Sequence, residues 1–166
     1  MLRVLRELLG YILGLALFVG LIPLLMWLVA GRPALCSETT AWQWIIGTIL
    51  IVAGLVLSIC TIVHMRLVGR GNPMDAFGHE VAPRTQHLMT DGPYSFSRNP
   101  MLLGVYILLG GWMVILFSWQ PILIFAAFFA IMSYQVTTEE KRLMNDFGTE
   151  YTDYCTKVHR YFGRKK

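Results

Sequence analysis

The sequence predicts an all-α integral membrane protein with about four transmembrane helices, a cytoplasmic loop and C-terminal amphipathic helices. Of its 166 residues, 55% are apolar and only 14% are charged, and the mean hydropathy is +0.55. A soluble domain usually carries about 25% charged residues to cover its surface. Long stretches free of Asp, Glu, Lys and Arg give the second indication. The three cysteines, an odd number set far apart in the chain, argue against a disulfide scaffold.

The first two predicted helices cover residues 8–30 and 41–63, each a charge-free run of 23 residues. A hydrocarbon core of roughly 30 Å is crossed by about 20 apolar residues, so each run fits one crossing. The first run is longer than the usual 7–15 residues of a signal-peptide core, and we expect it to remain uncleaved.

The third charge-free run, residues 101–136, is 36 residues long. As one helix it would measure about 54 Å, too long for a single crossing. Ser118, Trp119, Gln120 and Pro121 lie in its middle, where proline ends a helix and tryptophan favours the membrane interface. The run therefore predicts a hairpin of two helices, 101–118 and 120–136.

The basic residues predict the orientation. Of the 14 Lys and Arg residues, only Arg32 lies between the first two predicted helices, and none lies in the 118–121 turn. The positive-inside rule then places both termini in the cytoplasm, in a bacterial inner membrane or the endoplasmic reticulum. This orientation accounts for the positive net charge, which therefore does not indicate a nucleic-acid partner. Basic residues near the membrane surface favour contact with anionic lipids. The sequence leaves the oligomeric state open.

Two cytoplasmic pieces remain, residues 64–100 and 137–166. Neither is long enough for a core of its own, so we expect both to fold against the membrane helices and each other in a single domain, 1–166. In the second piece an apolar stripe is spaced as on a helix, and Gly148 is expected to divide it. The stripe consists of Leu143, Phe147, Tyr151, Tyr154, Val158 and Tyr161.

Several residues of these pieces allow both a structural and a functional interpretation. Gly69 and Gly71 either admit a ligand to the backbone or end a helix. Asn99 and Pro100 suit the start of a helix, where Arg98 could bind a carboxylate.

The pair Glu139–Glu140 either completes a capping box begun by Thr137 or binds ribose hydroxyls or an ammonium group. The four histidines show no ligand spacing, so no metal site is predicted.

Taken in order, these residues resemble a known superfamily. Gly92-Pro93-Tyr94, Arg98-Asn99-Pro100-Met101 and Gly104 are followed by Glu139-Glu140, Leu143, Phe147-Gly148, Glu150-Tyr151, Tyr154 and Arg160. Over about residues 69–162 this set is similar to the isoprenylcysteine carboxyl methyltransferase and phospholipid methyltransferase superfamily. Leu102 and Asn99 depart from the usual tyrosine and the frequent histidine, and a proline near the end is missing.

The resemblance implies that residues 64–166 form a half that binds S-adenosylmethionine, with residues 1–63 as two packing helices. It implies catalytic candidates Glu140 and Arg160. The cofactor-binding candidates that it implies are Gly69, Gly71, Tyr94, Arg98, Asn99, Pro100, Gly104, Glu139 and Glu140.

The implied function is methyl transfer from S-adenosylmethionine to a lipophilic small molecule or lipid at the cytoplasmic face, like isoprenylcysteine carboxyl O-methylation. An amine acceptor must first lose a proton, whereas a carboxylate needs no base, and no convincing base stands out. Phospholipid N-methylation remains an alternative. So does a reductase-like or structural membrane protein on the same scaffold.

Overall fold

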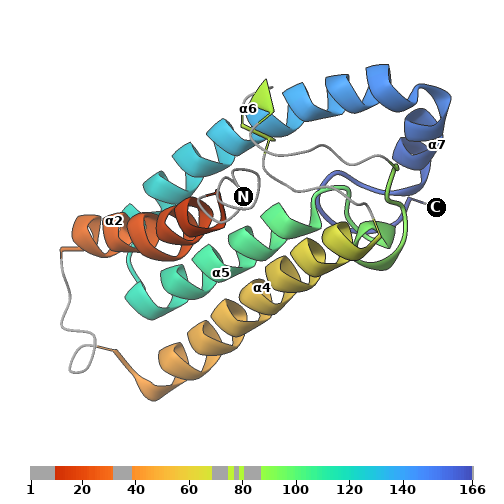
Figure 1. The fold of residues 1–166 in the computed structure, drawn as a ribbon. Coiled ribbons are helices and arrows are strands. Elements are labelled where there is room, and N and C mark those ends of the chain that lie inside the picture. Colours follow the sequence, from red (N-terminus) through yellow and green to blue (C-terminus); the bar gives the residue numbers. More distant parts are fainter. Residues whose placement is uncertain (1–9, 32–38, 69–74, 77–78, 81–86, 166) are drawn as a thin grey trace.

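The computed structural model describes residues 10–31, 39–68, 75–76, 79–80 and 87–165, and helices dominate them (Figure 1). The first helix, Gly10–Val29, contains a π-helical stretch, η1 (Ala16–Leu21), and then α2 (Ile22–Val29). The other helices in chain order are α4 (Ala41–Leu67), η2 (Gly92–Ser95), α5 (Pro100–Leu116), α6 (Gln120–Phe147) and α7 (Thr149–Lys157). The strands β1 (Asp75–Ala76) and β2 (His79–Glu80) pair antiparallel.

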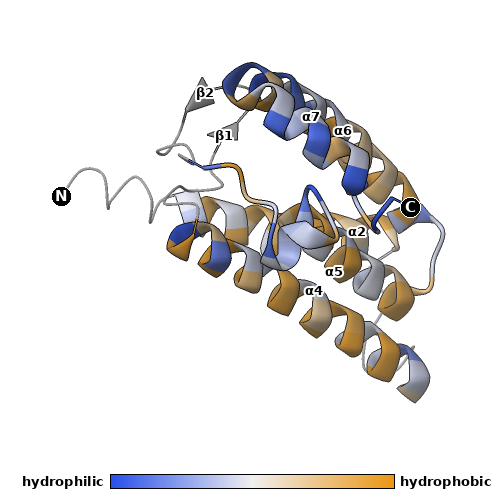
Figure 2. Ribbon diagram, turned by 90° about the vertical axis from the view of Figure 1, so that its right-hand side faces the viewer, coloured by the Kyte–Doolittle hydropathy of each residue, from blue (hydrophilic) through white to orange (hydrophobic). Residues whose placement is uncertain are grey.

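Three described helices are long and apolar enough to cross a membrane: Gly10–Val29, α4 and α6, with 20, 27 and 28 residues. The apolar helix α5 has 17 residues and spans about 25 Å, slightly less than a hydrocarbon core. Hydrophobic residues cover α2, α4, α5 and the first part of α6, whereas α7 and the end of α6 are hydrophilic (Figure 2). The all-α membrane class predicted from the composition is confirmed.

The predicted helix 101–118 spans Pro100–Leu116 instead, and two other predicted helix ends were wrong by more residues. Helix α4 continues to Leu67 rather than ending at 63, and α6 continues to Phe147 rather than ending at 136. The apolar run ends where the predicted crossing ends, but good helix formers follow it and no breaker occurs before Gly148, whose φ is 54°. The capping box expected at Thr137 and Glu140 is therefore absent, and the Thr137 hydroxyl donates to the Ser133 carbonyl at 2.8 Å.

Glycines bring α4 and α5 into close contact. A Cβ atom added to Gly54 would lie 2.4 Å from the Gly104 carbonyl oxygen, and one added to Gly111 would lie 2.6 Å from that of Gly47. In each helix the two glycines are seven residues apart, which places them on one face. The Ser58 hydroxyl adds a hydrogen bond of 3.1 Å to the Met101 carbonyl. Small residues of this kind are the usual means by which membrane helices approach each other.

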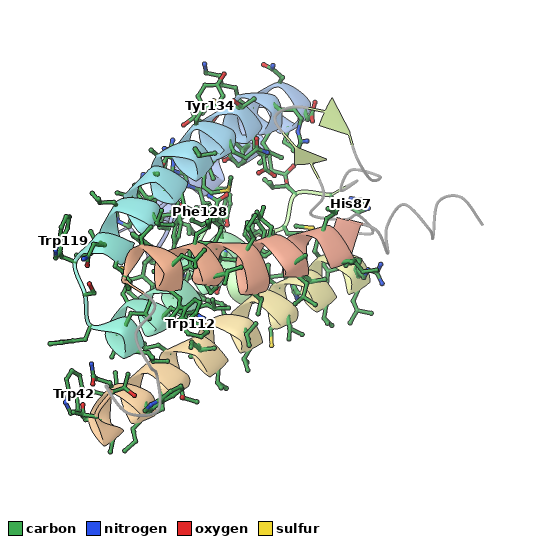
Figure 3. All side chains as sticks on the ribbon, turned by 90° about the vertical axis from the view of Figure 1, so that its left-hand side faces the viewer. Trp42, His87, Trp112, Trp119, Phe128 and Tyr134 are labelled. Atoms are coloured by element: carbon green, nitrogen blue, oxygen red, sulfur yellow. The ribbon has the colours of Figure 1, made fainter. Side chains whose placement is uncertain are left out.

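Aromatic rings fill the contact between α5 and α6. The Tyr106 ring of α5 lies 5.7 Å from Phe125, 5.9 Å from Phe128 and 5.2 Å from Phe129, all on α6. Figure 3 places Phe128 between α6 and α2, where its ring packs edge-on against Phe18 at 5.8 Å.

A second hydrophobic core lies where α7 packs against the loop before α5. It consists of Met89, Tyr94, Tyr151, Tyr154 and Val158, all at most 8% exposed. The first two residues come from the loop before α5 and the rest from α7 and its C-terminal end, so the two predicted cytoplasmic pieces do fold together. Gly148 ends α6 as expected, and α7 begins at the next residue.

Candidate functional site

A buried carboxylate is held between two guanidinium groups where α5, α6 and the C-terminal tail meet. Glu140 of α6 accepts hydrogen bonds from Arg160, with Nη2–Oε2 at 2.5 Å and Nε–Oε1 at 3.2 Å. Arg98 Nη1 lies 3.0 Å from Glu140 Oε1. The Glu140 and Arg98 side chains are only 11% and 12% exposed. We call Arg98, Glu140 and Arg160 the polar cluster.

The start of α5 brings Arg98 to this position. Pro100 is the first helical residue, where a missing N–H costs nothing, and it is fully buried. Asn99 precedes the helix as expected, but its side chain does not cap it. Asn99 Nδ2 instead donates to the Arg160 carbonyl at 3.1 Å, and the Arg98 N–H donates to the His159 carbonyl at 3.1 Å.

The tail after α7 folds back on itself and is fixed to the loop before α5. The His159 N–H donates to the Gly163 carbonyl at 2.9 Å, and the Gly163 N–H donates to the Phe96 carbonyl at 2.8 Å. Gly163 has a φ of 98°, a conformation that glycine adopts without strain. These backbone bonds hold Arg160 opposite Glu140.

The contact with Glu140 favours the charged form of Arg160. The hydrogen bond from Arg160 to Glu140 raises the pKa of the Arg160 guanidinium. Arg98 contributes a further contact, because its Nη1 lies 2.6 Å from the Cys155 sulfur. Its Nε is buried and has no hydrogen-bond partner among the described residues. Among the described residues, the cluster therefore retains at least this buried donor without a partner.

Tyr94 packs against α7, and Glu139 lies near the Tyr94 phenol. Tyr94 is 8% exposed, and Tyr154 donates a hydrogen bond of 2.6 Å to its carbonyl. Burial raises the pKa of the Tyr94 phenol, and the nearby Glu139 carboxylate raises it further. The Glu139 side chain is 37% exposed and lies 3.7 Å from the Arg142 guanidinium. Both carboxylates of the predicted pair thus belong to this region, but only Glu140 is enclosed.

The other predicted site residues lie elsewhere. Gly104 is in the contact with α4, where an added Cβ would lie 2.3 Å or more from Ser58 and Gly54 atoms, so packing accounts for this glycine. Gly69 and Gly71 lie outside the described residues. Within the part of the chain that the structure describes, no group of three or more His, Cys, Asp or Glu side chains could hold a metal ion.

Sequence reasoning missed one close pair. His64 at the end of α4 and Asp91 before η2 approach to 2.9 Å, between Nε2 and Oδ1. The imidazole lies over Gly92, where a Cβ atom would come within 2.7 Å of the ring. The hydrogen bond to His64 lowers the pKa of Asp91. The pair lies 27 positions apart, a separation that carries no spacing signal, and the Asp-Gly turn was the one available indication.

Comparison with known proteins agrees with this architecture. A family model described as "Phospholipid methyltransferase" matches residues 42–150, from the start of α4 into α7. The protein-S-isoprenylcysteine O-methyltransferase of Schizosaccharomyces pombe is 33% identical over 87 residues. That match covers 50% of this chain and 37% of the relative. No solved structure matches the chain.

The family model spans more than half of the sequence and includes Arg98, Glu139 and Glu140. The yeast relative is also a methyltransferase by name. The chain belongs to the phospholipid methyltransferase family, a family of membrane methyltransferases.

Proposed function

We propose that the protein transfers a methyl group from S-adenosylmethionine to the carboxylate of a lipophilic, prenylcysteine-like acceptor at the cytoplasmic face of a membrane. One observation carries the proposal: a charged cluster adjoins a layer of aromatic rings. Arg160 pairs with Glu140, while the next residue, Tyr161, lies 5.6 Å from Tyr106 and 5.5 Å from Phe129, ring to ring. Such a boundary suits a polar donor on one side and an apolar acceptor on the other.

The residues present fit the donor. S-adenosylmethionine carries a carboxylate, an ammonium group and ribose hydroxyls, and it supplies an electrophilic methyl group on a sulfonium. The unused Nε donor of Arg98 suits the carboxylate. The partly exposed Glu139 carboxylate suits the ammonium group or the hydroxyls. In this proposal Glu140 does not bind the donor itself but holds Arg98 and Arg160 in place.

The chain's own contribution is alignment. Methyl transfer from sulfur is an in-line displacement, which depends on holding the reacting groups together. Glu140 and the backbone bonds of the tail fix both arginines before any ligand arrives. A carboxylate acceptor reacts as the anion, so no residue has to remove a proton.

The family and the yeast relative support methyl transfer in general, and the relative's name supports the prenylcysteine acceptor. Phospholipid N-methylation is the second candidate, because the family description names phospholipids and the pair His64–Asp91 supplies a histidine oriented by a carboxylate. Such a histidine could accept the proton of an ammonium group.

The first test is calorimetric titration of the detergent-purified protein with S-adenosylmethionine, with reduced nicotinamide adenine dinucleotide phosphate in parallel. Saturable binding of the first compound alone is expected. We expect Arg98→Gln to weaken it at least about tenfold, because a charge-assisted hydrogen bond is lost. The control Arg164→Gln removes an exposed arginine of the same tail and should bind normally. Undiminished binding by a folded Arg98→Gln protein would contradict the assigned site, and nicotinamide binding alone would favour a reductase.

The acceptor is tested by transfer of a labelled methyl group to N-acetyl-S-farnesylcysteine and, separately, to phosphatidylethanolamine vesicles. A carboxyl methyl ester releases labelled methanol in base, whereas a methylated amine does not. Base-labile label in the prenylcysteine is the expected result. Stable label in the vesicle lipid would move the assignment to N-methylation.

A further inference from the structure

The hydroxyl group of Tyr106 is buried in α5. The residue is 9% exposed, and its hydroxyl has no hydrogen-bond partner among the described residues. Its ring lies among the rings of Phe125, Phe128, Phe129 and Tyr161, at 5.2–5.9 Å between centroids. This is the aromatic layer that adjoins the polar cluster.

Packing alone does not explain this hydroxyl. The nearest phenol is that of Tyr161, whose hydroxyl lies 2.9 Å from the Ser133 hydroxyl but forms no hydrogen bond with the Tyr106 oxygen. A buried donor without a partner costs free energy, and phenylalanine would fill the same space without that cost. The Tyr106 hydroxyl is therefore expected to serve a ligand.

The surroundings of Tyr106 extend to the outside of α6. Phe129 is 39% exposed, and Ser133 and Tyr161 are half-buried. A lipophilic molecule in the bilayer can therefore reach this layer from the side of α6. Its polar end would then lie next to Tyr161, one residue from Arg160 of the polar cluster.

We propose that Tyr106, Ser133 and Tyr161 form the recognition site for the carboxylate head of the acceptor, with the Tyr106 hydroxyl donating a hydrogen bond to one carboxylate oxygen. The inference rests on the proposed methyltransferase function. The second carboxylate oxygen forms the new bond to the methyl carbon as the carbon–sulfur bond breaks, and the sulfur leaves as a neutral thioether. Tyr106 keeps its proton throughout, so it orients the acceptor and takes no part in proton transfer.

The test measures binding without turnover. The probes are a farnesyl thioether that ends in a carboxylate and the matched thioether without it, titrated into the detergent-purified protein. The wild type is expected to prefer the acid by roughly tenfold to a hundredfold, the range of a hydrogen bond to a charged group. Tyr106→Phe should lose most of that preference while its melting temperature stays the same or rises and its affinity for S-adenosylmethionine is unchanged.

Tyr134→Phe is the matched control, because it removes a phenol hydroxyl from α6 that is 70% exposed. It should keep the acid preference. The inference is overturned if Tyr106→Phe keeps the preference and the wild-type kcat/KM, or if it loses stability and binds both probes equally weakly. The second result would show that the hydroxyl stabilises the fold, for example through Tyr161. Failure of the proposed function looks different: the wild type would then neither bind S-adenosylmethionine nor methylate the prenylcysteine.

Discussion

Helix α5 has two unlike sides. Toward α4 it presents Gly104 and Gly111, and the two backbones nearly touch. Toward α6 it presents Tyr106, and large rings separate the two backbones. In a bilayer, apolar surface alone does not drive helices together, so contact depends on how closely backbones and side chains fit.

The difference suggests a division of tasks. The glycine contact between α4 and α5 leaves no room for another molecule. The aromatic contact between α5 and α6 consists of large side chains, which in the proposed function would move aside to admit the acyl or prenyl chain of the acceptor. The polar cluster closes this second contact at one end, where Glu140 of α6 meets Arg98 before α5.

The largest effect is expected from closing the glycine contact. In Gly54→Ala the new methyl group would lie 2.4 Å from the Gly104 carbonyl oxygen and 2.6 Å from the Leu108 nitrogen, so the helices must separate. Overpacking against backbone predicts a loss of about 4 kcal/mol or more, seen as failure to fold or a large fall in melting temperature in detergent. Gly110→Ala on α5 is the control, since nothing lies within 4 Å of its Cβ position. Equal melting temperatures would show that α4 and α5 are not in such close contact.

The next effect concerns the polar cluster. Glu140→Ala leaves two arginines facing each other without their carboxylate, and breaking a buried pair from one side costs about 3–5 kcal/mol. Thermal unfolding should therefore occur at a lower temperature, and proteases should cut the tail sooner. Asp153→Ala removes an exposed carboxylate of α7 and should change neither measurement. A Glu140→Ala protein as stable as the control would mean that the cluster does not secure the tail.

The smallest effect is expected in the aromatic contact. Phe128 is 7% exposed and touches the rings of Phe18 and Tyr106, but lipid or neighbouring rings can fill part of the space left by Phe128→Ala. We expect a loss of about 1–2 kcal/mol, smaller than for buried phenylalanines of soluble proteins. Leu123→Ala, on the lipid-exposed face of the same helix at 61% exposure, serves as control. A loss as large as that of Gly54→Ala would remove the contrast between the two sides of α5.

The positions of the membrane helices could be predicted from the sequence because missing charges and a proline turn are local signals. The starts of α4 and α6 were predicted at the observed residues, 41 and 120. The far ends were not, because hydrophobicity shows where a helix leaves the membrane and not where its hydrogen bonding stops. Glycines seven residues apart in both helices were a usable signal for the α4–α5 contact that was not recognised.

The candidate site could be predicted only in part. Arg98, Glu140 and Arg160 each stood out, but their mutual pairing depends on how the tail folds back, which no spacing encodes. Asn99 shows the limit of local reasoning, since its suitability as a cap did not reveal that its side chain would bind the Arg160 carbonyl. Tyr106 carried no signal in the sequence, because a tyrosine within an apolar helix is an ordinary residue.

The order of the polar cluster along the chain has a consequence for biosynthesis. Arg98, Glu140 and Arg160 are synthesised in that order. The described membrane helices end at Phe147, so they are synthesised before Arg160. A released chain that ends at Lys157 would therefore contain all of the described membrane helices but would leave Glu140 without Arg160. The seven residues from Val158 to Arg164 complete the cluster.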